Sequence, residues 1–161
     1  MRFYSLKIQS FFWLIIFVTA PHLMCQTFTV SGNWAYTIPS TDVTEAGNDF
    51  TGIYSSASNQ VTMTVFWWFT DFLYRVEVRK DDVDWDSRLQ LYIQRTGDGW
   101  LWSGWINGGT SYQLITDSNQ LFFRGRRTVL GIPIQYQLRN VSVIIPAKTH
   151  STTVVFTFIQ E

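Results

Sequence analysis

Three aspartates at alternate positions form a candidate metal-binding site in the sequence. Asp82, Asp84 and Asp86 could together offer carboxylate oxygens to Ca²⁺, which takes about six to eight oxygen ligands in proteins. The surrounding sequence departs from the calcium-binding loop of an EF-hand. Ser87 stands where that loop needs a glycine, and Ile93 stands where a glutamate should close it. We therefore expect a solvated turn between two strands, with a calcium site as the alternative.

A second stretch could recognise a ligand through aromatic rings. Trp100, Trp102 and Trp105 lie within six residues and next to several glycines. Alternation along a strand puts Trp100 and Trp102 on one face. Flat aromatic rings beside small residues suit stacking on sugar rings, and Tyr112 could extend such a platform. The competing interpretation is burial, because tryptophan is also the largest side chain available to fill a core.

Catalysis finds little support in the sequence. After residue 25 the chain keeps one histidine, His150, which excludes most hydrolase triads and every multi-histidine metal site. Two carboxylates could act as acid and base, but the spacing of the aspartates singles out no pair. His150 lies in a polar stretch before the last predicted strand, so it is expected at the surface. We expect no enzyme and no cofactor.

The remaining charged feature is a compact basic cluster of Arg124, Arg126 and Arg127. Such a cluster could attract an acidic glycan or a phosphate group. The alternative is a solubilising strand edge, or a set of cations that balances a nearby acidic turn. After residue 25 the chain has ten basic and twelve acidic residues. This lack of a basic excess argues against a nucleic-acid partner.

Residues 1–25 have the layout of a secretory signal peptide. Arg2 and Lys7 lead into an apolar run that is too short to span a membrane. Cys25, the only cysteine, would end this leader, so residues 26–161 would form one exported domain without a disulfide. Alternatively, Cys25 is lipidated and anchors the chain to a membrane, although the residues before it fit plain export better. We expect a secreted or cell-surface protein, with the periplasm or the outer membrane as further options.

Alternation of apolar and polar residues runs through most of the exported part and predicts β-strands. The clearest strand spans residues 61–69, and its second half is apolar on both faces. Further candidates cover residues 28–38, 74–79, 89–94, 134–138, 141–145 and 153–159, and shorter ones lie around residues 53–54 and over residues 100–105, 112–115 and 121–123. No stretch has the spacing of an amphipathic helix. About nine short strands separated by turn residues predict a single antiparallel β-sandwich.

Two segments of the chain carry a family resemblance. These are the opening Phe-Thr-Val-Ser-Gly-Asn-Trp of residues 28–34 and the tail of residues 132–156, in which a proline turn precedes a final Thr/Val-rich strand. In these segments the chain resembles small secreted bacterial β-sandwich proteins of the spore coat U, pilin-like and WxL-type kinds. The resemblance implies an immunoglobulin-like sandwich at a cell surface with a structural, assembly or adhesive role. It implies no catalytic residues.

Two functions are therefore expected from the sequence. The first is a structural or adhesive surface protein whose exposed strand edges pair with another copy or with a partner protein. The alternative is a carbohydrate-binding module that holds a polysaccharide on Trp100, Trp102, Trp105 and Tyr112. Solvent exposure of the three tryptophans separates these hypotheses, because buried rings could not bind a polysaccharide and assembly would be the only hypothesis left.

Overall fold

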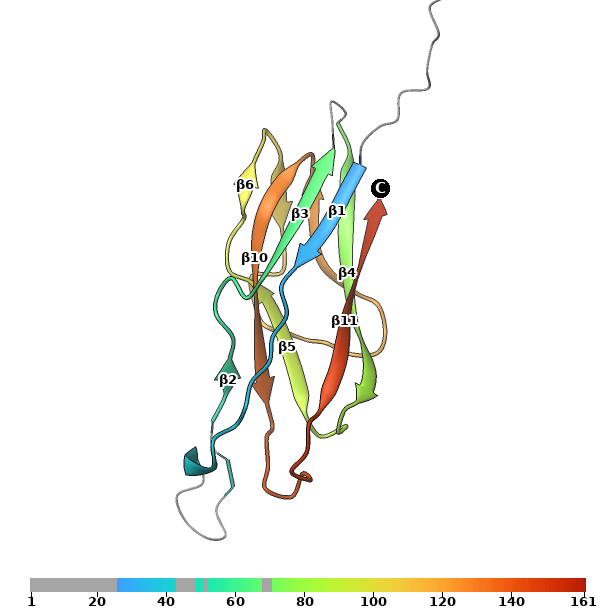
Figure 1. Cartoon of the computed structure of the whole chain (residues 1–161). Coiled ribbons are helices and arrows are strands. Elements are labelled where there is room, and N and C mark those ends of the chain that lie inside the picture. Colours follow the sequence, from blue (N-terminus) through green and yellow to red (C-terminus); the bar gives the residue numbers. More distant parts are fainter. Residues whose placement is uncertain (1–25, 43–48, 51, 68–70) are drawn as a thin grey trace, which may run out of the picture.

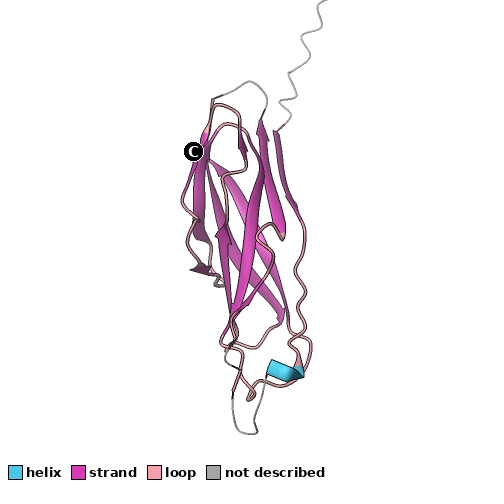
Figure 2. Cartoon of the chain, turned by 90° about the vertical axis from the view of Figure 1, so that its left-hand side faces the viewer, coloured by secondary structure: helices cyan, strands magenta, loops and turns pink. Residues whose placement is uncertain are grey.

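Two antiparallel β-sheets make up the fold (Figure 1). The computed structural model describes four ranges of the chain, residues 26–42, 49–50, 52–67 and 71–161. The leader predicted over residues 1–25 lies outside the described residues. Figure 2 shows the strands running along the long axis of the molecule, with one 3-10 turn, η1 (Ser40–Asp42), near one end. In the described ranges, no helix is long and apolar enough to cross a membrane.

The two sheets, named A and B here, contain seven and four strands. The main strands of sheet A, in spatial order, are β1 (Gln26–Ser31), β3 (Val61–Trp67), β10 (Val129–Arg139), β5 (Gln90–Arg95) and β8 (Gln113–Leu114). Two short strands also pair with β10, namely β2 (Tyr54–Ser55) and β6 (Trp100–Leu101). Sheet B contains, in order, β11 (Ser151–Gln160), β4 (Leu73–Asp84), β9 (Gln120–Arg126) and β7 (Trp105–Asn107).

The predicted alternation determines how these sheets pack. On β4, Tyr74, Val76 and Val78 are fully buried, and the residues between them are only half-buried. This confirms the strand predicted over residues 74–79 and the packing of one sheet face against the other. Apolar side chains from both sheets form the core between them, and its largest buried members include Met63, Ile93, Phe123, Ile132 and Ile134. The fold is therefore a β-sandwich.

The described residues form eleven strands, more than the nine or so that the alternation predicted. The strands β2, β6, β7 and β8 have only two or three residues each. The short candidates around residues 53–54 and over residues 112–115 coincide with β2 and β8, and the candidate over residues 121–123 lies within β9 (Gln120–Arg126). The candidate over residues 100–105 is divided between β6 and β7, which adds one strand to the count.

The strand predicted over residues 28–38 is wrong in its second half. β1 ends at Ser31, and residues 32–39 belong to no strand. Gly32 has a φ of +114°, and a Cβ at this position would lie 2.4 Å from the carbonyl oxygen of Gln60. Glycine is therefore required here, and the chain leaves the ladder at this point.

The strand predicted over residues 141–145 is also wrong. Residues 140–150 form turns that connect β10 to β11, and Asn140 has a φ of 60°. Only Val141 of this stretch is buried, where it packs in a small second cluster with Tyr54 and Leu89. Val143 and Ile144 are exposed. Asparagine tolerates the left-handed backbone that redirects the chain after β10, which the alternation alone did not reveal.

Candidate functional site

An open groove of about 590 Å³ lies between the edges of the two sheets. One side is formed by Val30 and residues 32–36, which follow β1, and the other by residues 149–154 and Phe156, which run into the first half of β11. Side chains of the buried core, among them Val61 and Tyr136, also line it. The groove therefore reaches from solvent into the interior of the sandwich.

Burial differs sharply between β11 and its neighbour β4. On β4, Val76 and Val78 are fully buried. On β11, Val154, Phe156 and Phe158 pack against the same core but stay only half-buried. β11 pairs with β4 along one side over its ten residues, and in the described ranges no strand pairs along its other side. The incomplete burial of β11 thus follows from its position at an open sheet edge.

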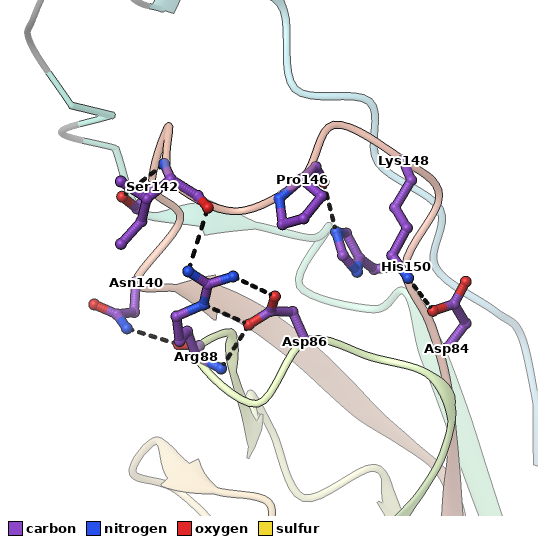
Figure 3. A network of polar contacts seen from close by, with 9 residues as sticks. Asp84, Asp86, Arg88, Asn140, Ser142, Pro146, Lys148 and His150 are labelled. Carbon is purple, nitrogen blue, oxygen red and sulfur yellow. Dashed lines mark hydrogen bonds and ion pairs between the residues drawn. The ribbon is translucent and has the colours of Figure 1, made fainter.

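His150 lies at the end of the groove beside the start of β11. Its Nε2 lies 3.1 Å from the carbonyl oxygen of Pro146, so this nitrogen carries the proton and donates it to that oxygen (Figure 3). Its Nδ1 is buried with no hydrogen-bond partner among the described residues. His150 was predicted at the surface, but it is half-buried.

An ion-pair network fixes the β10–β11 connection next to this groove (Figure 3). Arg88 donates hydrogen bonds of 2.8 and 2.7 Å to the two carboxylate oxygens of Asp86, and one of 3.2 Å to the carbonyl oxygen of Ile144. The Asn140 amide donates to the Arg88 carbonyl oxygen at 2.6 Å. The Arg88 hydrogen bonds hold the pKa of Asp86 well below its ordinary value. The turn after β4 therefore anchors the chain that leads into β11.

The three aspartates considered as calcium ligands each contact a different cation. Asp82 pairs with Lys80, Asp84 pairs with Lys148, and Asp86 pairs with Arg88. Over the ranges that the structure describes, no group of three or more His, Cys, Asp or Glu side chains could hold a metal ion. Two of these ion pairs are local, and the third, between Asp84 and Lys148, joins the end of β4 to the segment before β11.

The three tryptophans of the second stretch are all solvent-exposed, with exposed fractions of 56% for Trp100, 59% for Trp102 and 40% for Trp105. Leu101 packs against the core, and this turns Trp100 and Trp102 outward on either side of it. Their ring centroids lie 5.7 Å apart, with the ring planes at 61°. Trp100 and Trp102 thus form one exposed aromatic pair at the edge of sheet A.

Trp105 lies on the other sheet. The sequence predicted one strand over residues 100–105, but the chain breaks after Trp102 into β6 of sheet A and β7 of sheet B. Ser103 has a φ of 50°, and a Cβ on Gly104 would lie 2.0 Å from the carbonyl oxygen of Arg126. This crossing places Trp105 opposite Arg126 in the register of sheet B. Trp105 therefore belongs to a different face from the Trp100–Trp102 pair.

Tyr112 also lies apart from the tryptophan pair. Its hydroxyl donates a 2.9 Å hydrogen bond to Oε1 of Gln135 on β10. Trp100 is paired with Leu130 of the same strand, five residues before Gln135, so the two sites lie roughly 16 Å apart along β10 at about 3.3 Å per residue. Tyr112 instead lies beside Arg139, whose guanidinium carbon is 5.5 Å from the centre of its ring. The sequence did not single out Arg139 as a candidate binding residue, because no local pattern surrounds it.

A buried arginine holds the segment that carries the tryptophans. The Arg95 side chain is only 4% exposed and contacts the Asp98 carboxylate. It donates hydrogen bonds to the carbonyl oxygens of Gly97, at 3.2 Å, and of Gly108. These two glycines flank residues 98–107, so one side chain fixes both ends of the segment.

The basic cluster of the sequence is neutralised by carboxylates in the fold. Asp71 accepts hydrogen bonds from Nε of Arg126 at 2.7 Å and from Nε of Arg127 at 3.1 Å. These arginines, chiefly Arg126, lower the pKa of Asp71 to about 2. Arg124 pairs with Glu161 at 3.5 Å. The cluster therefore offers no free group of cations to an acidic ligand.

Comparison with known proteins leaves these surfaces to be interpreted from their geometry. The resemblance to spore coat U, pilin-like and WxL-type proteins stays a prediction. No protein-family model, curated protein or solved structure matches this chain.

Proposed function

We propose that this chain is an exported structural or adhesive protein of the cell surface that accepts a β-strand from a second copy along the open edge of β11. The observation that carries the proposal is the half-buried inner face of β11 beside a groove that reaches the core. A strand added to a sheet edge gains main-chain hydrogen bonds, and pockets for its alternate side chains give specificity. The groove offers both kinds of contact to a second copy.

We also propose that the sandwich is immunoglobulin-like, with one strand position vacant among the described residues. In the constant-type fold, strands A, B, E and D form one sheet and strands C, F and G the other. The order β1-β3-β10-β5 in sheet A and the neighbours β4 and β11 in sheet B correspond to A-B-E-D and C-F. Taken in chain order, these strands run from A to F, with β6 to β9 inserted between D and E. Strand G would then lie along the free edge of β11, beside the groove.

Sedimentation velocity of residues 26–161 over a wide concentration range tests the assembly proposal. Ala35 is exposed and lines the groove, so Ala35→Trp fills the groove without removing a core contact. Ala147 is also exposed but does not line it, so Ala147→Trp is the matched control. We expect the wild type and A147W to form larger species as concentration rises, and A35W to stay monomeric. A wild type that remains monomeric at millimolar concentration, or an A35W variant that assembles equally well, overturns the proposal.

A second candidate function is polysaccharide binding, favoured by the exposure of the Trp100–Trp102 pair. Two exposed indole rings 5.7 Å apart offer apolar faces to successive sugar rings. Titration with neutral polysaccharides such as β-glucan, xylan and chitin oligomers should shift the tryptophan fluorescence. Trp102→Ala should abolish the shift, whereas Trp105→Ala should preserve it because Trp105 lies on the other sheet. The absence of any shift across these polysaccharides removes this candidate.

A further inference from the structure

Arg139 differs from every other lysine and arginine side chain that the structure describes. Each of the others lies within 4 Å of a carboxylate and forms an ion pair. Arg139, at the end of β10, has no such partner in the described ranges. An arginine stays charged at every physiological pH. Among the described residues, Arg139 therefore gives the outer face of sheet A a positive charge that no carboxylate pairs with.

The Arg139 guanidinium is held in a fixed position. Its carbon lies 4.2 Å from the centre of the Tyr92 ring and 5.5 Å from the centre of the Tyr112 ring. Its Nε donates a 2.5 Å hydrogen bond to Oε1 of Gln137. Within the described ranges, its two terminal amino groups donate to no protein acceptor. They remain available as a planar pair of donors, which is the arrangement that binds a carboxylate through two parallel hydrogen bonds.

Neutral hydrogen-bonding groups surround this cation on the same face. Leu91 and Ile93 of β5 are buried between the sheets. Tyr92 and Gln94 alternate with them along the strand and therefore point to the outer face. Gln135 of β10 is paired with Gln94, and their side-chain amides are joined by a 2.9 Å hydrogen bond. Amides and phenolic hydroxyls suit the hydroxyl groups of a sugar, and tyrosine rings suit its apolar faces.

We propose that the outer face of sheet A around Arg139 binds an acidic polysaccharide, with the carboxylate of a uronic acid unit on the two terminal amino groups of Arg139. One isolated cation matches the single negative charge of a carboxylate, whereas a phosphate group is usually met by a cluster of cations. Gln135 accepts hydrogen bonds from Gln94 and Tyr112 and so positions them, and Oε1 of Gln94 and the hydroxyl oxygen of Tyr112 accept hydrogen bonds from the hydroxyl groups of neighbouring units. This site lies on the outer face of sheet A, so it is separate from the groove beside β11, and it binds whether or not the chain assembles.

Calorimetric titration with polygalacturonate, alginate and hyaluronate tests the site, with fully methyl-esterified polygalacturonate as the uncharged control. We expect wild-type residues 26–161 to bind at least one acidic polymer and to bind the ester at least about tenfold more weakly, since tenfold corresponds to the loss of one charged contact. Arg139→Gln should lose the same factor. Arg124→Gln, at an exposed arginine on sheet B, should bind as the wild type does.

Chemical protection tests the same site without a substitution. Phenylglyoxal modifies accessible arginines, and mass spectrometry of the modified wild type should show that the bound acidic polymer lowers labelling of Arg139 but not of Arg124. Either of two results overturns the proposal. One is equal binding of the acidic polymer by the wild type and R139Q, and the other is no binding of any of the three acidic polymers.

Discussion

The rings of Phe28 on β1 and Phe158 on β11 lie 5.6 Å apart and join the edge of sheet A to the edge of sheet B. This contact closes the sandwich at the end where β1 begins and β11 finishes (Figure 1). Further along β11, Phe156 and Val154 line the open groove instead. One side of the molecule is thus closed by aromatic packing over part of its length and open over the rest. The open part is where we propose that a second copy adds its strand.

Because Phe156 lines the open groove and Phe123 lies in the closed core, their truncation to alanine should lower the free energy of unfolding by different amounts. Phe123 is 1% exposed, so Phe123→Ala should lower the free energy of unfolding by about 3–5 kcal/mol. Phe156 is half-buried beside the groove, so Phe156→Ala should cost the dilute monomer roughly 1–3 kcal/mol. Urea denaturation at low concentration measures both values. Equal losses would show that Phe156 is as well packed as the core.

Removal of the Tyr74 hydroxyl, in Tyr74→Phe, should stabilise the fold. This hydroxyl is buried, with no hydrogen-bond partner among the described residues, and its burial raises the pKa of Tyr74 well above the ordinary value. A buried polar group without a partner costs about 1–3 kcal/mol. Tyr74→Phe should therefore raise the free energy of unfolding by about 1 kcal/mol. A clear loss of stability in thermal and urea unfolding would contradict this expectation and indicate a partner for the hydroxyl.

The ion pair of Asp71 predicts a pH-dependent stability difference. Arg126 and Arg127 lower the pKa of Asp71 to about 2, from an ordinary value of 3.8. A carboxylate with a lowered pKa in the folded state stabilises the fold above its unfolded pKa, and this contribution disappears as the pH falls through the folded pKa. Asp71→Asn should therefore melt at a lower temperature than the wild type at pH 7. The gap should narrow between about pH 4 and pH 2. A difference in melting temperature that stays constant over this pH range would contradict the stabilising role of the Asp71 ion pair.

Substitution of Arg95 should destabilise residues 98–107, the segment that carries Trp100, Trp102 and Trp105, without unfolding the rest of the domain. Arg95→Gln removes the hydrogen bonds to the Gly97 and Gly108 carbonyl oxygens, and leaving such acceptors unsatisfied costs about 1–3 kcal/mol. Hydrogen exchange should accelerate in residues 97–108 and remain unchanged in β4. As a control, Arg79→Gln removes an arginine whose carboxylate partner lies 3.7 Å away, so it should leave exchange in residues 97–108 unaltered. Uniform acceleration throughout the chain would contradict a local role for Arg95.

The sequence predicted the elements whose pattern extends over several residues. Alternation found β3, β4, β5, β10 and β11, because burial of one sheet face selects apolar residues at every second position. It also placed Trp100 and Trp102 on a common face. It failed after Ser31, Trp102 and Asn140, where a single backbone conformation redirects the chain while the apolar pattern continues. Local patterning does not record such a change of direction.

The candidate sites were less predictable than the elements. Exposed strand edges were expected, but the groove depends on which two strands end the sheets, and that order is a tertiary property. Arg139 was missed because its isolation is defined by the carboxylates that pair with the other cations, and these partners come from distant parts of the chain. Arg126 and Arg127, in contrast, looked like a free basic cluster until Asp71 was placed beside them.

Hydrogen–deuterium exchange resolved to single strands is the most direct test of whether a second copy pairs with the open edge of β11. The measurement compares deuterium uptake by residues 151–160 of β11 at micromolar and millimolar concentrations of residues 26–161. Uptake by β11 should fall at high concentration, because a second copy pairs with its open edge, while uptake by β6 should stay the same. Unchanged uptake by β11 under conditions in which the protein assembles would contradict it.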